Sequence, residues 1–128
     1  MDFEAKIAEL GLLIPKPAKP AGSYKPCVIV DNIAYISGQG PLLEDGSFAK
    51  GKVGADVDLE TAQNHARLCG LAILSALKNE IGSINKVDQL IKLTGFVNCI
   101  ESFTQQPLVI NGCSNMMQDI FGETGVHA

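Results

Sequence analysis

The stretch IAYISGQGP, residues 33–41, joins an apolar segment to a small polar turn that ends at a proline. Residues 33–36 are aliphatic or aromatic apart from one alanine, a composition typical of a buried strand. Residues 37–40, SGQG, would lie at the carboxyl end of this strand, where glycine leaves backbone amides open to close approach. Two interpretations follow, a shelf for a small ligand or an ordinary strand that runs into a turn.

The segment before this stretch predicts a β-hairpin. Residues 27–30 and 33–36 are apolar, and Asp31-Asn32 between them tolerates the positive φ angles of a tight turn. After Pro41, residues 44–47 indicate another turn, and residues 48–53 a short edge strand with two lysines that discourage pairing with other chains.

The N-terminal part predicts a short helix followed by an extended arm. Residues 2–10 place apolar side chains at helical spacing, and Gly11 provides a stop. Prolines at positions 15, 17, 20 and 26 exclude a helix from the next segment.

Two longer helices are expected farther along the chain. The first begins at Asp58, which can cap free amides, and runs to about Ile81, where Gly82 ends it. Its expected apolar stripe is Ala62, Ala66, Cys69, Ile73, Ala76 and Leu77. The second begins near Pro107 and ends at Gly122, and its expected face is Ile110, Cys113, Met117, Ile120 and Phe121.

Residues 87–99 form the longest predicted strand, with one apolar side and one mixed side. The order of elements predicts a single α+β domain over residues 1–128, a two-layer sandwich with both helices on one face of a mixed sheet. The other face carries Leu90 and Phe96, so we expect a homo-oligomer that buries it. Because a helix beside a sheet normally leads into another strand, we also expect a strand after Ala128.

Composition narrows the function classes. The 128 residues carry a net charge of −4 and one arginine, Arg67, which argues against nucleic-acid binding. No apolar run approaches the ~20 residues of a membrane span, and no leader pattern precedes the first helix, so we expect a cytoplasmic protein without a membrane partner. The four cysteines lie far apart in apolar stretches, which favours buried free thiols over disulfides or a metal site.

The order of these features resembles the RidA/YjgF-type reactive-intermediate deaminases, in a branch with a longer N-terminal arm. The matching motifs are PAGSY at residues 20–24, YISGQ at 35–39, Asp45-Gly46, KLTGFV at 92–97 and the helix that ends at Phe121. This resemblance implies a chorismate-mutase-like fold and a homotrimer with clefts between subunits. It implies hydrolysis of 2-imino and enamine acids to 2-keto acids and ammonia, without a metal or cofactor.

The resemblance also implies site residues. Tyr24 would line the cleft, Ser37 and Gly38 would hold a substrate carboxylate at the strand end, and Asn115 would border the cleft, with Asn111 as its rival. The family's carboxylate-binding arginine would follow Ala128, and its acidic residue lies farther on, so the catalytic residues of residues 1–128 stay unassigned. The alternatives are a non-catalytic trimer that binds small carboxylates and, less in keeping with one arginine, an endoribonuclease or translation inhibitor.

Overall fold

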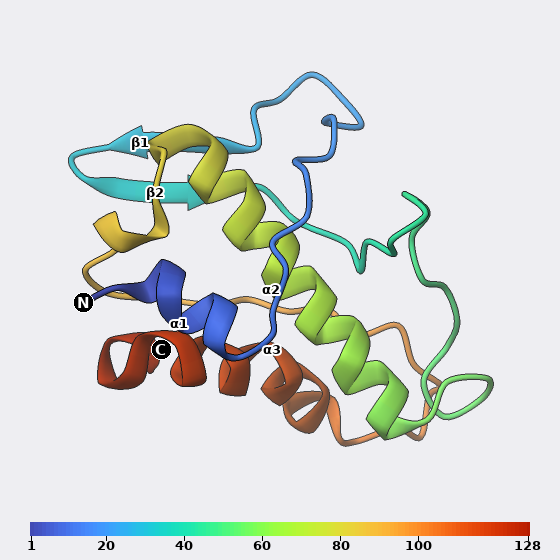
Figure 1. The fold of residues 1–128 in the computed structure, drawn as a ribbon. Coiled ribbons are helices and arrows are strands. Elements are labelled where there is room, and N and C mark those ends of the chain that lie inside the picture. Colours follow the sequence, from blue (N-terminus) through green and yellow to red (C-terminus); the bar gives the residue numbers. More distant parts are fainter.

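A computed structural model describes residues 1–128 and shows a small α+β fold (Figure 1). A two-stranded antiparallel sheet lies over one end of a long central helix, and a second long helix packs along that helix. The elements in chain order are α1 (Phe3–Glu9), β1 (Cys27–Val30), β2 (Ile33–Ile36), α2 (Leu59–Ile81), the 3₁₀ turn η1 (Ile84–Lys86), α3 (Gln106–Phe121) and the 3₁₀ turn η2 (Gly122–Gly125).

The predicted ends of α2 and the predicted hairpin turn are confirmed. The Asp58 carboxylate accepts the Thr61 N–H at 2.8 Å, and Gly82 ends α2 with a φ of 88°. The strands β1 and β2 pair in antiparallel register, with Asp31 and Asn32 at φ 50° and 63°. These two residues have side chains that tolerate the left-handed region, so they make the primed turn that matches the strand twist.

The predicted long strand at residues 87–99 differs, because it is extended but belongs to no sheet. Near one end, the Leu90 N–H donates to Thr124 O and the Ala128 N–H donates to Ile91 O. At the other end, Val53 makes an isolated parallel bridge to Cys99. Residues 92–97 have no backbone hydrogen bond, because no strand of the described chain pairs with them.

Two further expectations about the sheet are corrected. Residues 48–53 do not form an edge strand and make only isolated bridges, from Phe48 to Leu42 and from Val53 to Val57 and Cys99. The hairpin contacts α2 but not α3, which packs against α2, α1 and η2 instead. Only one helix therefore covers the two-stranded sheet.

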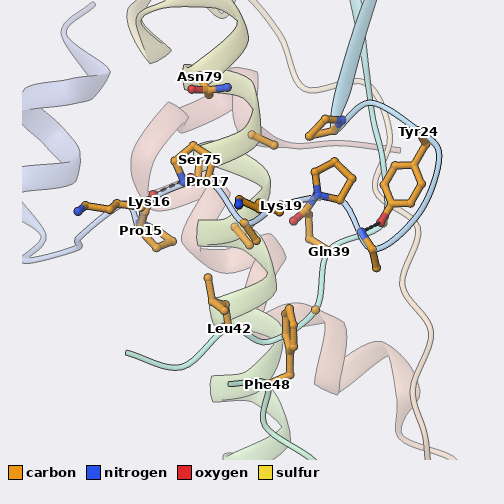
Figure 2. A pocket seen from close by; sticks show the side chains of 18 residues that line it. Pro15, Lys16, Pro17, Lys19, Tyr24, Gln39, Leu42, Phe48, Ser75 and Asn79 are labelled. Carbon is orange, nitrogen blue, oxygen red and sulfur yellow. Dashed lines mark hydrogen bonds between the residues drawn. The ribbon is translucent and has the colours of Figure 1, made fainter. Parts of the chain in front are cut away.

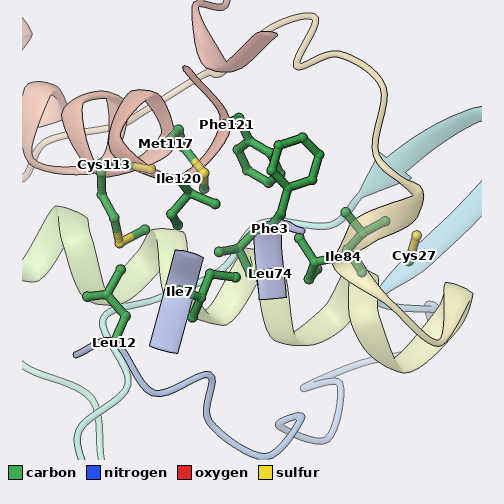
Figure 3. Close-up of a cluster of buried hydrophobic side chains, with 12 residues drawn as sticks. Phe3, Ile7, Leu12, Cys27, Leu74, Ile84, Cys113, Met117, Ile120 and Phe121 are labelled. Carbon is green, nitrogen blue, oxygen red and sulfur yellow. The ribbon is translucent and has the colours of Figure 1, made fainter. Parts of the chain in front are cut away.

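The main core lies where α1, α2 and α3 meet (Figure 3). Phe3 and Phe121 pack edge to face with ring centroids 4.8 Å apart. The predicted stripe of α2 was wrong in part, because Ala66, Cys69 and Ile73 are only half-buried, whereas Ala62, Ala76 and Leu77 are buried as predicted. Residues 72, 74 and 75 are buried in addition, since the Pro-rich arm and η1 cover another side of the helix. Met117 is a core residue, as predicted, and its neighbour Met116 is buried as well.

The outer face of the hairpin is apolar and exposed. Val28 lies opposite Tyr35, and Val30 lies opposite Ile33, so these four side chains share the face that α2 does not cover. Phe96, on the extended segment, is 94% exposed. None of the helices is both long and apolar enough to cross a membrane.

Candidate functional site

A cavity of about 120 Å³ lies between the Pro-rich arm, one side of α2 and the segment after β2 (Figure 2). Tyr24 and Gly38 both line it, so the structure brings together two of the residues that the sequence singled out. It is large enough for a ligand of roughly eight to twelve water-sized groups. The sites that the resemblance places at Tyr24 and Gly38 therefore share one concave surface within a single chain.

The segment 38–40 is a shelf of free amides, as one of the two interpretations of the sequence requires. The Ser37 N–H donates to Pro26 O at 2.9 Å, which closes the last ladder position of the hairpin. The N–H groups of residues 38, 39 and 40 then have no partner in the described chain, and all three residues line the cavity. Three consecutive amides with no competing acceptor can bind an anion such as a carboxylate.

Hydrogen bonds of Ser37 fix the residue that precedes this shelf. Its hydroxyl donates to Lys25 O at 2.7 Å, and its carbonyl accepts the Gln39 side-chain amide at 3.2 Å. Ser37 does not line the cavity. The structure thus gives this serine a positioning contact, and its binding of a carboxylate stays a prediction.

The Pro-rich arm has one contact to α2 and one local contact at its own end. Ser75, a buried polar residue of α2, donates its hydroxyl to Pro15 O at 2.6 Å. At the other end, the Tyr24 hydroxyl accepts the Ala21 N–H at 3.1 Å. The hydroxyl hydrogen of Tyr24 stays free to donate to a ligand, because this contact uses only the oxygen.

The ionisable groups that line the cavity are two cations and a phenol. Lys16 and Lys19 come from the arm and Tyr24 follows it, whereas no carboxylate, histidine or cysteine lines the cavity. In Figure 2, Lys19 lies among the lining side chains near Gln39, and Lys16 extends away from them. The cavity therefore presents donors and positive charge, which suits an anionic ligand.

The asparagine that the resemblance places at the cleft lies elsewhere in this chain. Asn115 is exposed on α3 and does not line the cavity, and neither does its rival Asn111. Gln39 belongs to the stretch that the sequence indicated as a possible shelf, whereas sequence reasoning missed Lys19 and Ser75 as lining residues. The close spacing of lysines and prolines in the arm was the signal for Lys19, but nothing local indicated that α2 would hold the arm.

All four cysteines are free, and no cluster of three or more His, Cys, Asp or Glu side chains is placed to hold a metal ion. The expectation of four buried thiols was wrong in part, because Cys69 and Cys99 are half-buried. Burial between the helices raises the pKa of the Cys113 thiol to about 12, with a smaller effect from nearby Cys69. Burial also raises the pKa of Cys69 and Cys27. These three thiols stay protonated at neutral pH, which makes them poor nucleophiles.

The whole chain matches known proteins. Residues 4–128 match the family model described as "YjgF/chorismate mutase-like, putative endoribonuclease". The chain is 35% identical over 125 residues to protein TCP17 of Trypanosoma cruzi, a match that covers 97% of this chain and 78% of that protein.

Two solved structures share the fold. One is a "putative endoribonuclease" from Shewanella oneidensis MR-1, 31% identical, with a TM-score of 0.95 over 100% of this chain and 85% of the other. The second is Atu1372 from Agrobacterium tumefaciens, a protein of unknown function, 41% identical, with a TM-score of 0.87 over 98% of this chain and 76% of the other.

Proposed function

The chain belongs to the YjgF/chorismate mutase-like family, and from this premise we propose that it hydrolyses small 2-imino and enamine acids to 2-keto acids and ammonia. A substrate such as 2-aminoacrylate would enter through its imine tautomer. The observation that carries the proposal is that Tyr24 and the three free amides of residues 38–40 line one cavity. Those amides supply a carboxylate grip without any charged side chain.

The chemistry needs a held carboxylate, a positioned water and proton transfers. Water adds its oxygen to the imine carbon, and a proton moves to the nitrogen, which gives a carbinolamine. The remaining hydroxyl proton is then transferred to the amine nitrogen, the C–N bond breaks with its electron pair going to the departing ammonia, and the carbonyl double bond of the 2-keto acid forms. The Tyr24 hydroxyl, free to donate, is the group of this chain best suited to protonate or orient the nitrogen.

The proposed assembly is a homotrimer in the cytoplasm, with the site in a cleft between subunits. The exposed outer face of the hairpin, formed by Val28, Val30, Ile33 and Tyr35, supports association because four neighbouring apolar side chains gain by leaving water. A neighbouring copy would then cover the open side of the cavity and contribute the groups that a single chain does not place there. Asn115, exposed on α3, would act from such a neighbour.

One observation favours a second function, the non-catalytic binding of small carboxylates. No side chain that lines the cavity can act as a carboxylate or imidazole base, whereas the free amides and Lys19 can hold an anion. Binding alone would use these donors as they stand. An endoribonuclease role, which the description of the Shewanella protein suggests, fits less well with the single arginine and the net charge of −4.

A coupled assay tests the proposed reaction. An enzyme that generates 2-aminoacrylate supplies the substrate, and the release of pyruvate above the uncatalysed rate is measured for this protein at fixed oligomer concentration. We expect Tyr24→Phe to lose about 100-fold or more in rate, the typical contribution of a positioned proton donor. Tyr35→Phe is the matched control, because it removes the only other phenol of the chain.

Three results separate the candidates. Acceleration that Tyr24→Phe abolishes and Tyr35→Phe retains supports the proposal. Binding of pyruvate by calorimetry without any acceleration favours the binding function. Acceleration that is unchanged in Tyr24→Phe would contradict the role given to this tyrosine.

A further inference from the structure

The arm adds a cation to a cavity that already has a carboxylate grip. We infer that Lys19 is a specificity-determining residue that binds a second anionic group of the ligand, an inference that rests on the proposed function and deepens it. The cavity then prefers 2-imino acids that carry a second carboxylate, and their 2-keto acid products, over acids with a neutral side chain of the same length.

Lys19 is a charged residue of the cavity lining that has no ion-pair partner. The ion pairs of the chain involve Lys6 with Glu9 and Lys78 with Glu4, so the Lys19 ammonium has no carboxylate partner. No acidic side chain lines the cavity that could neutralise it. An ammonium without a partner is available to a ligand anion, as a point charge that needs no fixed approach direction.

The backbone that carries this lysine is held in place before a ligand arrives. Ser75 ties the arm to α2 through Pro15, and prolines at 15, 17 and 20 restrict the φ angles on both sides of Lys19. At the far end, the Ala21 N–H is bonded to the Tyr24 hydroxyl. Less backbone freedom is lost on binding when the segment is already ordered, so the charge is more effective there than on a mobile loop.

The cavity also takes its two kinds of anion contact from two different segments. The shelf amides belong to residues 38–40, after β2, and Lys19 belongs to the Pro-rich arm. In Figure 2, Lys19 lies near Gln39, and the apolar side chain of Phe48 is also part of the lining. A monocarboxylate occupies the shelf and leaves the ammonium to solvent. A dicarboxylate satisfies both, which is the physical basis of the preference.

The test compares two four-carbon 2-keto acids as stable mimics of the imines. Freshly prepared 2-oxosuccinate carries the second carboxylate, and 2-oxobutyrate ends in a methyl group. Calorimetry on the assembled protein at constant ionic strength gives the Kd of each acid for the natural sequence, Lys19→Gln, Lys19→Arg and Lys50→Gln. Lys50→Gln is the matched control, since it removes the same charge at an exposed lysine that does not line the cavity.

We expect the natural sequence to bind 2-oxosuccinate about tenfold more tightly than 2-oxobutyrate, the scale of one charge-assisted hydrogen bond. Lys19→Gln should remove this ratio while leaving the Kd of 2-oxobutyrate within about threefold, and Lys19→Arg should keep it, because the charge is retained. Lys50→Gln should keep the ratio as well. Thermal unfolding of each variant verifies that the exposed substitutions leave the fold intact.

A failure of the proposed function and a failure of the Lys19 inference give different binding results. If 2-oxobutyrate and 2-oxosuccinate both fail to bind the natural sequence, the shelf itself is wrong and the proposed function fails together with the inference. If 2-oxobutyrate binds but 2-oxosuccinate is not preferred, or if Lys19→Gln leaves the ratio unchanged, only the inference is overturned. An equal loss in Lys50→Gln and Lys19→Gln would assign the effect to net charge and also overturn it.

Discussion

Ser75 decides where the arm lies, although its hydroxyl is far in sequence from the segment that it holds. The side chain is 4% exposed, and the bond to Pro15 O satisfies a polar group that burial would otherwise penalise. No sequence pattern predicts such a contact for a serine within an apolar helical stripe. Gly38 was identified because its signal is local, whereas the roles of Ser75 and Lys19 depend on a contact across 60 residues.

The Cys113 thiol makes the stability of the protein fall at high pH. Its pKa is raised to about 12 in the folded chain from an ordinary value of 9.0. Above pH 9 the unfolded chain loses this proton while the folded chain keeps it, so stability is lost as the pH rises from about 9 to 12. The slope from one such thiol is at most about 1.4 kcal/mol per pH unit.

Urea unfolding between pH 8 and 11, with reductant present, measures this dependence. Cys113→Ala should show a shallower decline than the natural sequence, because it removes the titrating group. Cys99→Ala, which removes a half-exposed thiol outside the main core, should leave the decline unchanged. Parallel curves for all three proteins would contradict the assignment, since lysine and tyrosine titration is common to them.

At the scale of elements, the helices and the hairpin could be predicted because each carries its own end signals. Asp58 and Gly82 bracket α2, Gly122 ends α3, and Asp31-Asn32 make the hairpin turn. Residues 87–99 have the alternation of a strand, but they form none in the structure. A ladder, however, needs a second segment alongside, which no property of the strand itself supplies. The arm cavity could not be predicted for the same reason.

Two glycines set the approach of α2 and α3, and they should respond differently to alanine. A methyl group at Gly112 would collide with the backbone carbonyl of Gln63 on α2, which no side-chain rotation can relieve. At Gly70 the same methyl group would meet the Met116 Cε at 2.6 Å and the Cys113 Sγ at 2.8 Å, the ends of movable side chains. We therefore expect Gly112→Ala to cost about 1–3 kcal/mol of unfolding free energy.

Gly70→Ala should change stability by less than about 1 kcal/mol, because the higher helix propensity of alanine offsets the crowding. Chemical denaturation of both variants at neutral pH gives the comparison. The interpretation of α2·α3 packing would be wrong if Gly70→Ala proved the more damaging of the two.

At the scale of the whole molecule, the apolar outer face of the hairpin predicts association. Val28, 46% exposed, lies on this face, so a charge placed there would be buried in any assembly that covers it. We expect light scattering after gel filtration to show a trimer for the natural sequence and mostly monomer for Val28→Glu. Leu13→Glu is the control, because Leu13 is 82% exposed and lies before the arm, away from this face.

The outcome also bears on the site. If Val28→Glu is monomeric and folded, its affinity for 2-oxobutyrate reports how much of the carboxylate grip belongs to one chain. A natural sequence that elutes as a monomer at all concentrations would contradict the proposed trimer. It would also remove the neighbouring copy as the source of Asn115 at the cavity.

Because the backbone of residues 92–97 is unpaired, the rate of hydrogen exchange at its amides reports whether another chain binds there. Amide hydrogens without an acceptor exchange with solvent deuterium almost as fast as those of an unstructured peptide. Amide hydrogens inside α2 and α3 exchange only when the helices open. Mass spectrometry after brief labelling should find this peptide fully deuterated in a dilute, dissociated sample. Slow deuterium uptake by residues 92–97 in the assembled protein would show that a strand pairs with them. Unchanged fast uptake would show that these residues stay unpaired in the assembly.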